Sequence, residues 1–301
     1  MITNQTKKTL LSSIGLLSVA GLAVADDTTS GYSGIESMDA PKVEQKLQIN
    51  PGFTYVAETE FDNNTFGKVS VSRFDVPIRY TMKMEQGELG LGAFYEFSSY
   101  DFTGAPGTED FNTLAFDAIW KSMFNDKWGY FVYGGVGFSA SEEASLGDGA
   151  TGVGAGGVRY VVSPTLSFGL GVGVASQLED DPSVLPIINV NWQINDRWNL
   201  RVLNGAVISY DISGDKKFLV DAGIKYQRRQ YRLEQGSSAL IETMVTVEAG
   251  ATYHFTPNFG LRGFVGVSAA RNFEIRADSD KVADEDADTA PYFGVRALMT
   301  F

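Results

Sequence analysis

Apolar residues occupy every second position through much of this chain, and the alternation is easiest to follow at its C-terminal end. The apolar face of the final segment consists of Phe293, Val295, Ala297, Met299 and Phe301. A period of two places successive side chains on opposite faces of a β-strand, so one face of this strand suits lipid. Because the strand ends on an aromatic residue, we interpret this face as the assembly signal of a membrane-inserted β-barrel.

Similar segments of about ten residues precede it, each separated from the next by a turn signal. The pattern predicts fourteen strands, over residues 43–57, 67–82, 87–101, 110–123, 128–140, 151–163, 165–176, 186–194, 197–204, 205–213, 216–232, 241–255, 258–274 and 290–301. Such a run indicates an all-β fold, a transmembrane antiparallel up-and-down β-barrel. A soluble β-sandwich also alternates, so periodicity does not decide between the two folds by itself.

The connections favour the barrel. Tight turns lie at Gln86-Gly87, Asn125-Asp126, Ser163-Pro164, Asn195-Asp196, Gly214-Asp215 and Pro257-Asn258, and longer polar segments at 58–66, 102–109, 141–150, 177–185, 233–240 and 275–289. The two kinds alternate, as short periplasmic turns and longer external loops do in outer-membrane barrels. The tight Asn204-Gly205 connection is the exception, because it falls on the external side. If the pair of strands that it joins did not cross the membrane, twelve strands would span it.

Aromatic residues gather beside the tight turns. They are Trp120, Trp128, Tyr130, Trp192, Trp198, Phe255, Phe259 and Phe301. Aromatic side chains prefer the boundary between lipid and water, so this arrangement predicts an interfacial girdle on the periplasmic side.

The first residues have the pattern of a secretory signal peptide. Lys7 and Lys8 form a positive region, residues 10–20 form a short apolar stretch, and Ala23-Val24-Ala25 is a small-residue cleavage site. We therefore expect a signal peptide over 1–25, a flexible periplasmic lead-in over 26–42 and an outer-membrane β-barrel over 43–301. Export of this kind places the barrel in the outer membrane of a Gram-negative bacterium.

Composition excludes several classes of function. Acidic residues number 37 against 24 basic ones, and a net charge of -13 argues against nucleic-acid binding. The absence of Cys excludes disulfides, Cys-ligated zinc and thiol catalysis. A hydrophobic content of 44% is compatible with a barrel, because only one face of each strand is apolar.

Charged residues concentrate on the strand face opposite to the apolar one. We predict that the lumen is lined by Arg73, Asp75, Arg79, Glu96, Asp117, Arg159, Arg201, Asp211, Asp221, Lys225, Glu248, Arg262 and Arg296. A charge on the lipid face would cost about 2–4 kcal/mol at mid-depth, so confinement to one face supports the assignment. Both signs are present, which indicates ion pairs in a hydrated interior rather than a single-sign filter. Inward glycines either leave room for solute or admit neighbouring aromatic rings.

Neither catalysis nor a cofactor is indicated. The single histidine, His254, adjoins the Thr256-Pro257 turn, whereas outer-membrane Ser-His hydrolases act near the opposite leaflet. Four acidic residues form a weak calcium candidate: Asp278, Asp280, Asp284 and Asp286. The segment lacks the central Gly and terminal Glu of an EF-hand loop, so a solvated acidic loop is the alternative. We expect no enzyme, no cofactor and no dedicated metal site.

Three tracts carry a resemblance: residues 226–233 with the sequence YQRRQYRL, the Thr256-Pro257-Asn258 turn, and the terminal Phe301. With them, the whole mature chain resembles an uncharacterised family of Gram-negative outer-membrane β-barrel proteins, built on a domain of unknown function. The resemblance implies the barrel and its compartment but little about activity. The strand count is also similar to that of the long-chain fatty-acid transporters, although this lead-in is shorter and more polar than their hatch and this lumen is charged.

The sequence therefore favours a monomeric or weakly oligomeric barrel that forms a narrow passive pore for small polar solutes. One alternative is a non-conducting structural or surface-binding barrel that acts through its acidic external loops. A more distant one is an outer-membrane lipid-modifying enzyme. The expected partners are outer-membrane lipid and lipopolysaccharide, the barrel-assembly machinery that recognises the last strand, and periplasmic chaperones, but no nucleic acid.

Overall fold

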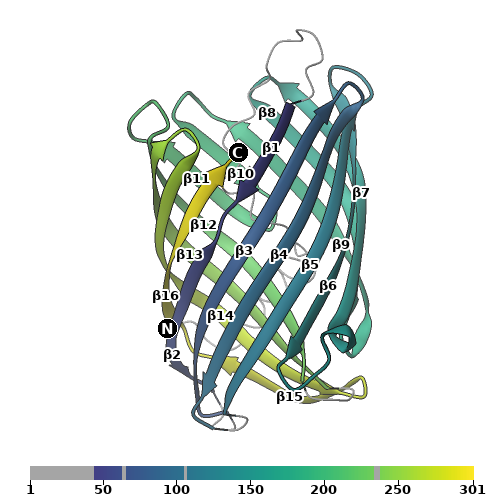
Figure 1. Ribbon diagram of the computed structural model, residues 1–301, viewed down its shortest axis with the longest axis vertical. Helices are drawn as coiled ribbons and strands as arrows, with labels where there is room; N and C mark the ends of the chain where they lie inside the picture. The colour runs from purple at the N-terminus through teal and green to yellow at the C-terminus, as the bar shows by residue number, and fades with distance from the viewer. Residues whose placement is uncertain (1–43, 63–65, 105–106, 234–237) are drawn as a thin grey trace.

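The chain forms a closed antiparallel β-barrel of fourteen strands, seen in a computed structural model that describes residues 44–62, 66–104, 107–233 and 238–301 (Figure 1). The strands are β1 Glu44–Ile49, β2 Gly52–Glu60, β3 Lys68–Met84, β4 Gly87–Phe102, β5 Thr108–Met123, β6 Trp128–Ser141, β7 Ala150–Ser163, β8 Leu166–Gln177, β9 Asp180–Gln193, β10 Trp198–Val202, β11 Gly205–Asp211, β12 Phe218–Arg232, β13 Ser238–Thr256, β14 Phe259–Ala277, β15 Asp280–Ala287 and β16 Ala290–Thr300. β1 and β2 are successive parts of one barrel strand, and so are β15 and β16, which gives the fourteen. The predicted fold class is confirmed.

The first barrel strand is interrupted at Pro51. Proline has no backbone N–H to donate and breaks the hydrogen-bond ladder. The neighbouring Asn50 N–H instead donates to the Pro77 carbonyl across the sheet at 3.1 Å. The expected first strand, 43–57, therefore becomes two pieces that pair with the same neighbours, β3 and β16.

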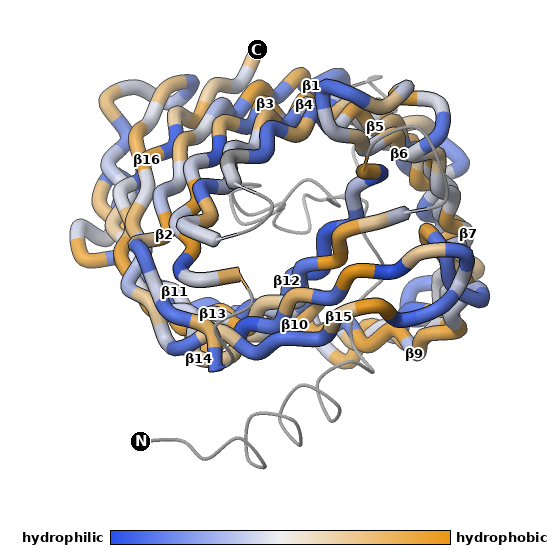
Figure 2. Tube along the Cα trace, turned by 90° about the horizontal axis from the view of Figure 1, so that it is seen from below, coloured by the Kyte–Doolittle hydropathy of each residue, from blue (hydrophilic) through white to orange (hydrophobic). Residues whose placement is uncertain are grey.

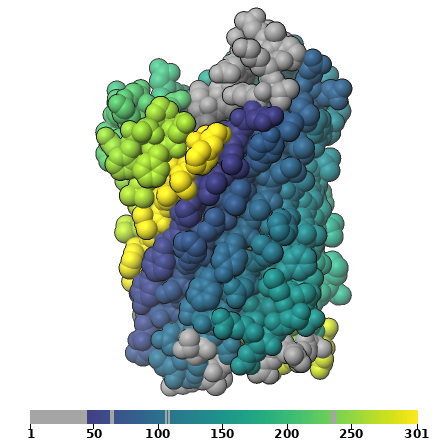
Figure 3. Space-filling view, in the orientation of Figure 1, coloured from purple at the N-terminus to yellow at the C-terminus, as the bar shows by residue number. Residues whose placement is uncertain are grey.

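The barrel closes between its first and last strands. β16 pairs with β14 on one side and with β2 and β1 on the other. At the very end, the Phe301 N–H donates to the Leu47 carbonyl at 2.8 Å and the Leu47 N–H donates back at 3.0 Å. Figure 3 shows this seam, where the last strand lies directly beside the first and leaves no free edge.

The outer surface is apolar along the strands. Large side chains such as Leu170 and Val265, 61% and 63% exposed, point away from the barrel. The predicted girdle residues Trp128, Trp192 and Trp198 are exposed beside the tight turns. A barrel with an apolar wall and an aromatic belt is the architecture that crosses an outer membrane. Among the described residues, no helix is long and apolar enough to cross a membrane.

The end that carries the tight turns, here called the tight-turn end, is the lower end of the barrel, and the loop end is its upper end; Figure 1 shows the molecule with the loop end downward. At the loop end two predicted loops are largely strand. Much of 177–185 belongs to β9, and much of 275–289 forms β15, which pairs with the upper part of β14. β15 carries no apolar face, so its alternation could not reveal it. A four-residue 3₁₀ helix, η3 Leu146–Gly149, lies in the predicted loop 141–150.

The upper parts of β12, β13 and β14 leave the barrel wall and fold inward. Residues 239–242 of β13 are four consecutive buried positions, whereas the wall below alternates, with Val247 exposed and Glu248 buried. A register shift between Val245 and Thr246 marks the bend. The end of β12 forms a parallel bridge to β6, from Arg232 to Ala140, although five strands separate them around the wall. We call residues 227–232, 238–245 and 270–277 the tip; Figure 2 shows it from the loop end.

Candidate functional site

The barrel interior is the candidate site, and its outer half is organised around one buried carboxylate. Glu242 lies on the tip and is 1% exposed. Arg73 of β3 reaches it at 2.5 Å, and Arg271 of β14 donates to it at 2.7 Å. The Tyr100 hydroxyl donates to the same carboxylate at 2.7 Å. A buried charge must be paired, so these contacts fix the tip against the wall.

A second carboxylate extends the network across the barrel. Glu96 of β4 accepts hydrogen bonds from Arg229 of β12 at 3.0 Å and from the Tyr231 hydroxyl at 3.2 Å. β4 and β12 lie on opposite sides of the barrel in the strand order. We call Arg73, Glu96, Tyr100, Arg229, Tyr231, Glu242 and Arg271 the outer network. Among the described residues, Arg73 Nε and Arg271 Nη1 find no hydrogen-bond partner.

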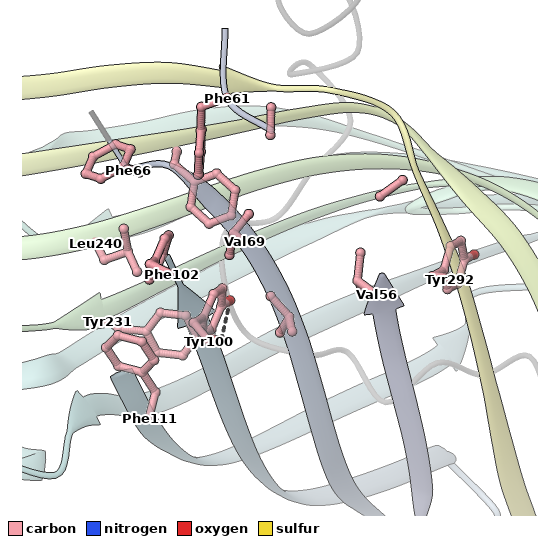
Figure 4. Close-up of a cluster of buried hydrophobic side chains, with 14 residues drawn as sticks. Val56, Phe61, Phe66, Val69, Tyr100, Phe102, Phe111, Tyr231, Leu240 and Tyr292 are labelled. Atoms are coloured by element: carbon pink, nitrogen blue, oxygen red, sulfur yellow. Dashed lines mark hydrogen bonds between the residues drawn. The ribbon is translucent and has the colours of Figure 1, made fainter. Parts of the chain in front are cut away.

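Aromatic rings pack around Tyr100 and Tyr231, the two tyrosines of the outer network (Figure 4). Phe111 of β5 stacks on Tyr231 with ring centroids 4.3 Å apart, and Phe273 of β14 meets Phe61 at 5.3 Å. We call the buried rings the aromatic cluster: Phe61, Phe66, Tyr100, Phe102, Phe111, Tyr231 and Phe273. The cluster joins strands from both sides of the barrel, so side chains from opposite walls pack together inside it toward the loop end.

Below the outer network the interior holds separate ion pairs, which we call the inner pairs. Arg296 binds Asp75 through both guanidinium nitrogens at 2.7 and 2.9 Å, and Arg79 binds Asp117 at 2.7 Å. A larger group joins Arg262 to Asp221 and Glu248 at 2.5 and 2.8 Å, with Lys225 at 2.9 Å from Glu248. Towards the tight turns, Lys121 and Glu88 pair at 3.2 Å and stay 44% and 31% exposed.

Three other residues expected in the lumen have different surroundings. Arg159 is exposed and donates to the Ser167 hydroxyl at 3.2 Å. Arg201 lies on β10 opposite Asn191 of β9. Asp211 accepts hydrogen bonds from the Gly214 and Lys216 N–H groups at 2.9 and 2.8 Å, so it shapes a tight turn.

Two inward glycines sit beneath an aromatic ring. A Cβ on Gly157 would lie 2.6 Å from the Phe131 ring, and one on Gly171 would lie 2.8 Å from it. Phe131 therefore covers both glycines, and the space above them is occupied by a side chain of the barrel. Here the small residues admit a neighbour instead of widening the lumen.

Acidic residues of the loop end bind polar and basic neighbours. Asn272 donates to Asp284 and Asp286 at 2.8 and 3.0 Å, and Lys281 lies 3.2 Å from Asp284. Burial lowers the pKa of Lys281, but hydrogen bonds with Glu274 and Asp284 outweigh burial and raise it above its usual value. In the part of the chain that the structure describes, no three His, Cys, Asp or Glu residues gather as metal ligands would. The four aspartates of the calcium candidate are thus not brought together.

Comparison with known families fits this picture. Residues 89–298 match the family described as a domain of unknown function (DUF6268). The chain belongs to this family. The matched region runs from β4 to β16, so it contains the whole tip and all of the outer network except Arg73. No curated protein is similar in sequence to this member of DUF6268.

Solved barrels are similar to it in outline. An outer membrane channel from Pseudomonas putida F1 has 10% identity and a TM-score of 0.45 over 89% of this chain and 100% of its own. The Pseudomonas putida toluene transporter TodX has 10% identity and a TM-score of 0.43, over 86% and 90%. The translocator domain of the autotransporter NalP from Neisseria meningitidis has 10% identity and a TM-score of 0.38, over 97% and 96%. Likeness at this level carries no argument about activity.

The sequence missed the residues that organise the outer half. Arg229, Glu242 and Arg271 were not among the predicted lumen residues, although they contact Arg73 and Glu96, which were. Arg229 continues the inward face of Lys225, and Glu242 continues that of Glu248. Extending the period of two to the ends of β12 and β13 would have found both; the inward fold of the tip had no such signal.

Proposed function

We propose that this protein is an outer-membrane pathway for small polar solutes whose external mouth is closed at rest by the tip. The single observation that supports it is the contrast along the barrel axis. Towards the tight turns, the side chains of Lys121 and Glu88 stay 44% and 31% exposed, whereas those of Arg73, Glu242 and Arg271 at the centre of the outer network are at most 2% exposed. A polar interior suits hydrated solutes, and a packed constriction suits a gate.

The proposal includes compartment and partners. The protein would be exported from the cytoplasm of a Gram-negative bacterium through a signal peptide cleaved after Ala25, which lies outside the described residues, as does the lead-in 26–42. Outer-membrane lipid and lipopolysaccharide would surround the apolar wall. The barrel-assembly machinery and periplasmic chaperones would deliver it, and no nucleic acid would take part.

We propose transport without catalysis. The one histidine, His254, lies near the end of β13 beside the Thr256-Pro257 turn. Its neighbour across the strands is Gly260, which offers neither a nucleophile nor an acid. A Ser-His pair at this end would also face away from the outer leaflet, where lipid substrates of surface enzymes lie.

Conductance across a planar bilayer tests the proposal directly. The refolded mature chain should give rare, small current steps with weak ion selectivity, because both charge signs line the interior. Tyr231→Ala removes the ring that stacks on Phe111 and the hydroxyl that reaches Glu96, so it should raise the frequency or size of the openings. Phe116→Ala, on the lipid-facing side of β5 and 46% exposed in the parent, is the matched control.

If neither the folded parent nor the folded Tyr231→Ala variant gives current steps, conduction through the barrel is refuted. That result would instead favour the second candidate, a closed barrel that acts through its acidic loop end. The specific observation that favours this candidate is the outer network itself, which joins opposite walls through the ion pair between Glu96 and Arg229, with side chains 6% and 21% exposed. Heat-modifiable migration in gels distinguishes a silent folded barrel from one that never folded.

Assembly gives an independent prediction. Deleting Phe301 removes both backbone hydrogen bonds to Leu47 and the terminal aromatic ring, which is 68% exposed. We expect severalfold less heat-modifiable protein in the outer membrane, measured by fractionation after expression of the full precursor. Phe301→Tyr, which keeps the ring and the backbone, is the control. Equal amounts of the deletion variant and the parent would refute a role of the last residue in insertion.

A further inference from the structure

The barrel wall is incomplete on one side. β10 has five residues and β11 has seven, whereas a strand needs about 9–11 residues to cross the hydrocarbon at a 45° tilt. At a rise of about 3.3 Å per residue, two such short strands reach roughly half-way across. Their connection, Leu203-Asn204, therefore lies inside the bilayer, and above it β9 and β12 have no strand between them.

The facing edges of β9 and β12 have the character of free edges. The Gln193 N–H donates to the Thr165 carbonyl on the β8 side. Because N–H groups alternate in direction along a strand, the even-numbered residues back from Trp192 point their N–H groups to the other side, toward the gap. One of those positions is Pro186, which carries no N–H, and Pro182 lies in the register shift at the start of β9. Proline is tolerated within sheets only where its missing donor faces no partner. On the other side, the Tyr226 N–H reaches the Asn204 carbonyl at 3.1 Å, and the ladder toward β11 ends there.

An arch closes the gap above. The Leu178 N–H, in the β8–β9 turn, donates to the Gln230 side chain at 2.8 Å. Arg232 binds Glu179 at 2.6 Å, and Arg276 binds Asp180 at 2.9 Å. β9 and β12 are thus linked on one side by the β10–β11 connection, which we call the floor, and on the other by the arch. We call the interval between floor and arch, in which no strand pairs β9 with β12, the side window. Its sides are residues 181–189 and 226–229.

One arginine stands in the side window without a direct partner. Arg228 lies on the outward face of β12, two residues above Tyr226 at the floor and two below Gln230 at the arch. Its guanidinium makes no hydrogen bond or ion pair with the described residues. The nearby acids Asp180 and Glu274 act on it at longer range, but both already bind Arg276. A half-buried cation in this position is complementary to an anionic group.

The rim around that cation is apolar. Val184 and Ile188 of β9 are 66% and 41% exposed, and Ile224 of β12 is 37% exposed. We propose that the side window is a lateral site for an anionic amphiphile of the outer leaflet, whose charged head binds Arg228 and whose apolar part stays against the rim. The site goes beyond the axial pathway and does not depend on it.

Two fluorescent probes of equal length test the site, 11-(dansylamino)undecanoate and its neutral alcohol. Protein in detergent micelles is titrated with each and dansyl emission is recorded. Arg228→Gln should weaken binding of the carboxylate about ten- to a hundredfold, as loss of a charged hydrogen bond does, and leave the alcohol unchanged. Arg197→Gln, the same change in an exposed tight turn, is the matched control.

Location is tested separately, on the unaltered protein. A diazirine-bearing hexadecanoate is photo-crosslinked to the full mature chain in vesicles, and the adducts are mapped by mass spectrometry. Adducts within 181–189 and 224–229 are expected. Adducts confined to other parts of the wall, or carboxylate binding that Arg228→Gln does not change, would overturn the side window. A conducting barrel that fails both tests refutes this site alone, and a silent barrel that passes them refutes only axial conduction.

Discussion

Two ion pairs towards opposite ends of the barrel interior join a basic and an acidic side chain in different surroundings. In the outer half, Arg73 and Glu242 pair with side-chain exposures of 2% and 0%. Towards the tight turns, Lys121 and Glu88 pair with exposures of 44% and 31%. A buried pair leaves an uncompensated charge if one partner is lost, whereas a hydrated pair does not. The first kind can hold a structural element in place, and the second keeps an interior polar.

The same contrast appears in the aromatic residues. Phe111 is fully buried against Tyr231 from the opposite wall, whereas Phe116, on the same strand, is 46% exposed to lipid. Rings that cross the interior close it, and rings that face outward anchor it. In the proposed function the tip closes the barrel, and substitutions in the two halves should separate stability of the tip from polarity of the lumen.

The largest difference is expected for the two glutamates. Glu242→Gln leaves Arg73 and Arg271 buried without a counter-charge and should lower the free energy of unfolding by about 3–5 kcal/mol. Glu88→Gln, in the hydrated pair with Lys121, should lower it by about 0–1 kcal/mol. Urea titration of the heat-modifiable form measures both. Equal losses would mean that the two halves do not differ in the way their burial indicates.

A smaller difference is expected between two phenylalanines of β5. Phe111→Ala removes a ring from a packed cluster and should cost about 3–5 kcal/mol, because a cavity remains. Phe116→Ala loses contact with lipid, which refills the space, so its cost should be lower by roughly 1–2 kcal/mol. The same titration checks this, and a reversed order would contradict closure by the aromatic cluster.

Much of the wall follows from the period of two. Inward and outward faces of β16 are distinguishable from residues 293–301 alone, because lipid excludes charge from one face and water accepts it on the other. The tight turns could be predicted equally well, since Asn, Asp, Gly and Pro permit backbone conformations that strands avoid. The interruption of the wall also had a signal, because the tight Asn204-Gly205 connection was the one exception to the alternation of turns and loops. The structure places this connection at the floor of the side window.

The inward fold of the tip could not be read in the same way. Residues 239–242 are Ala-Leu-Ile-Glu, so three apolar residues in a row break the period of two, but the sequence does not indicate which partner on the far wall buries both faces. Such contacts join Glu96 to Arg229 across 133 positions of the chain, and no local pattern specifies them. β15 escaped prediction for a related reason, because its pairing with β14 is carried by backbone hydrogen bonds and by acids bound to Asn272.

The smallest effect concerns glycine and tests how tightly the interior of the wall is filled. A Cβ on Gly157 would lie 2.3 Å from the Leu170 carbonyl oxygen and 2.6 Å from the Phe131 ring, so Gly157→Ala should cost about 1–3 kcal/mol. Gly154, on the outward face of the same strand, has nothing within 4 Å of such a Cβ, and its replacement by Ala should stay within about 0.5 kcal/mol of the parent. Urea midpoints of the two folded variants measure the difference. If Gly157→Ala is as stable as Gly154→Ala, the ring of Phe131 can move aside, and the inward glycines then hold space that a solute could share.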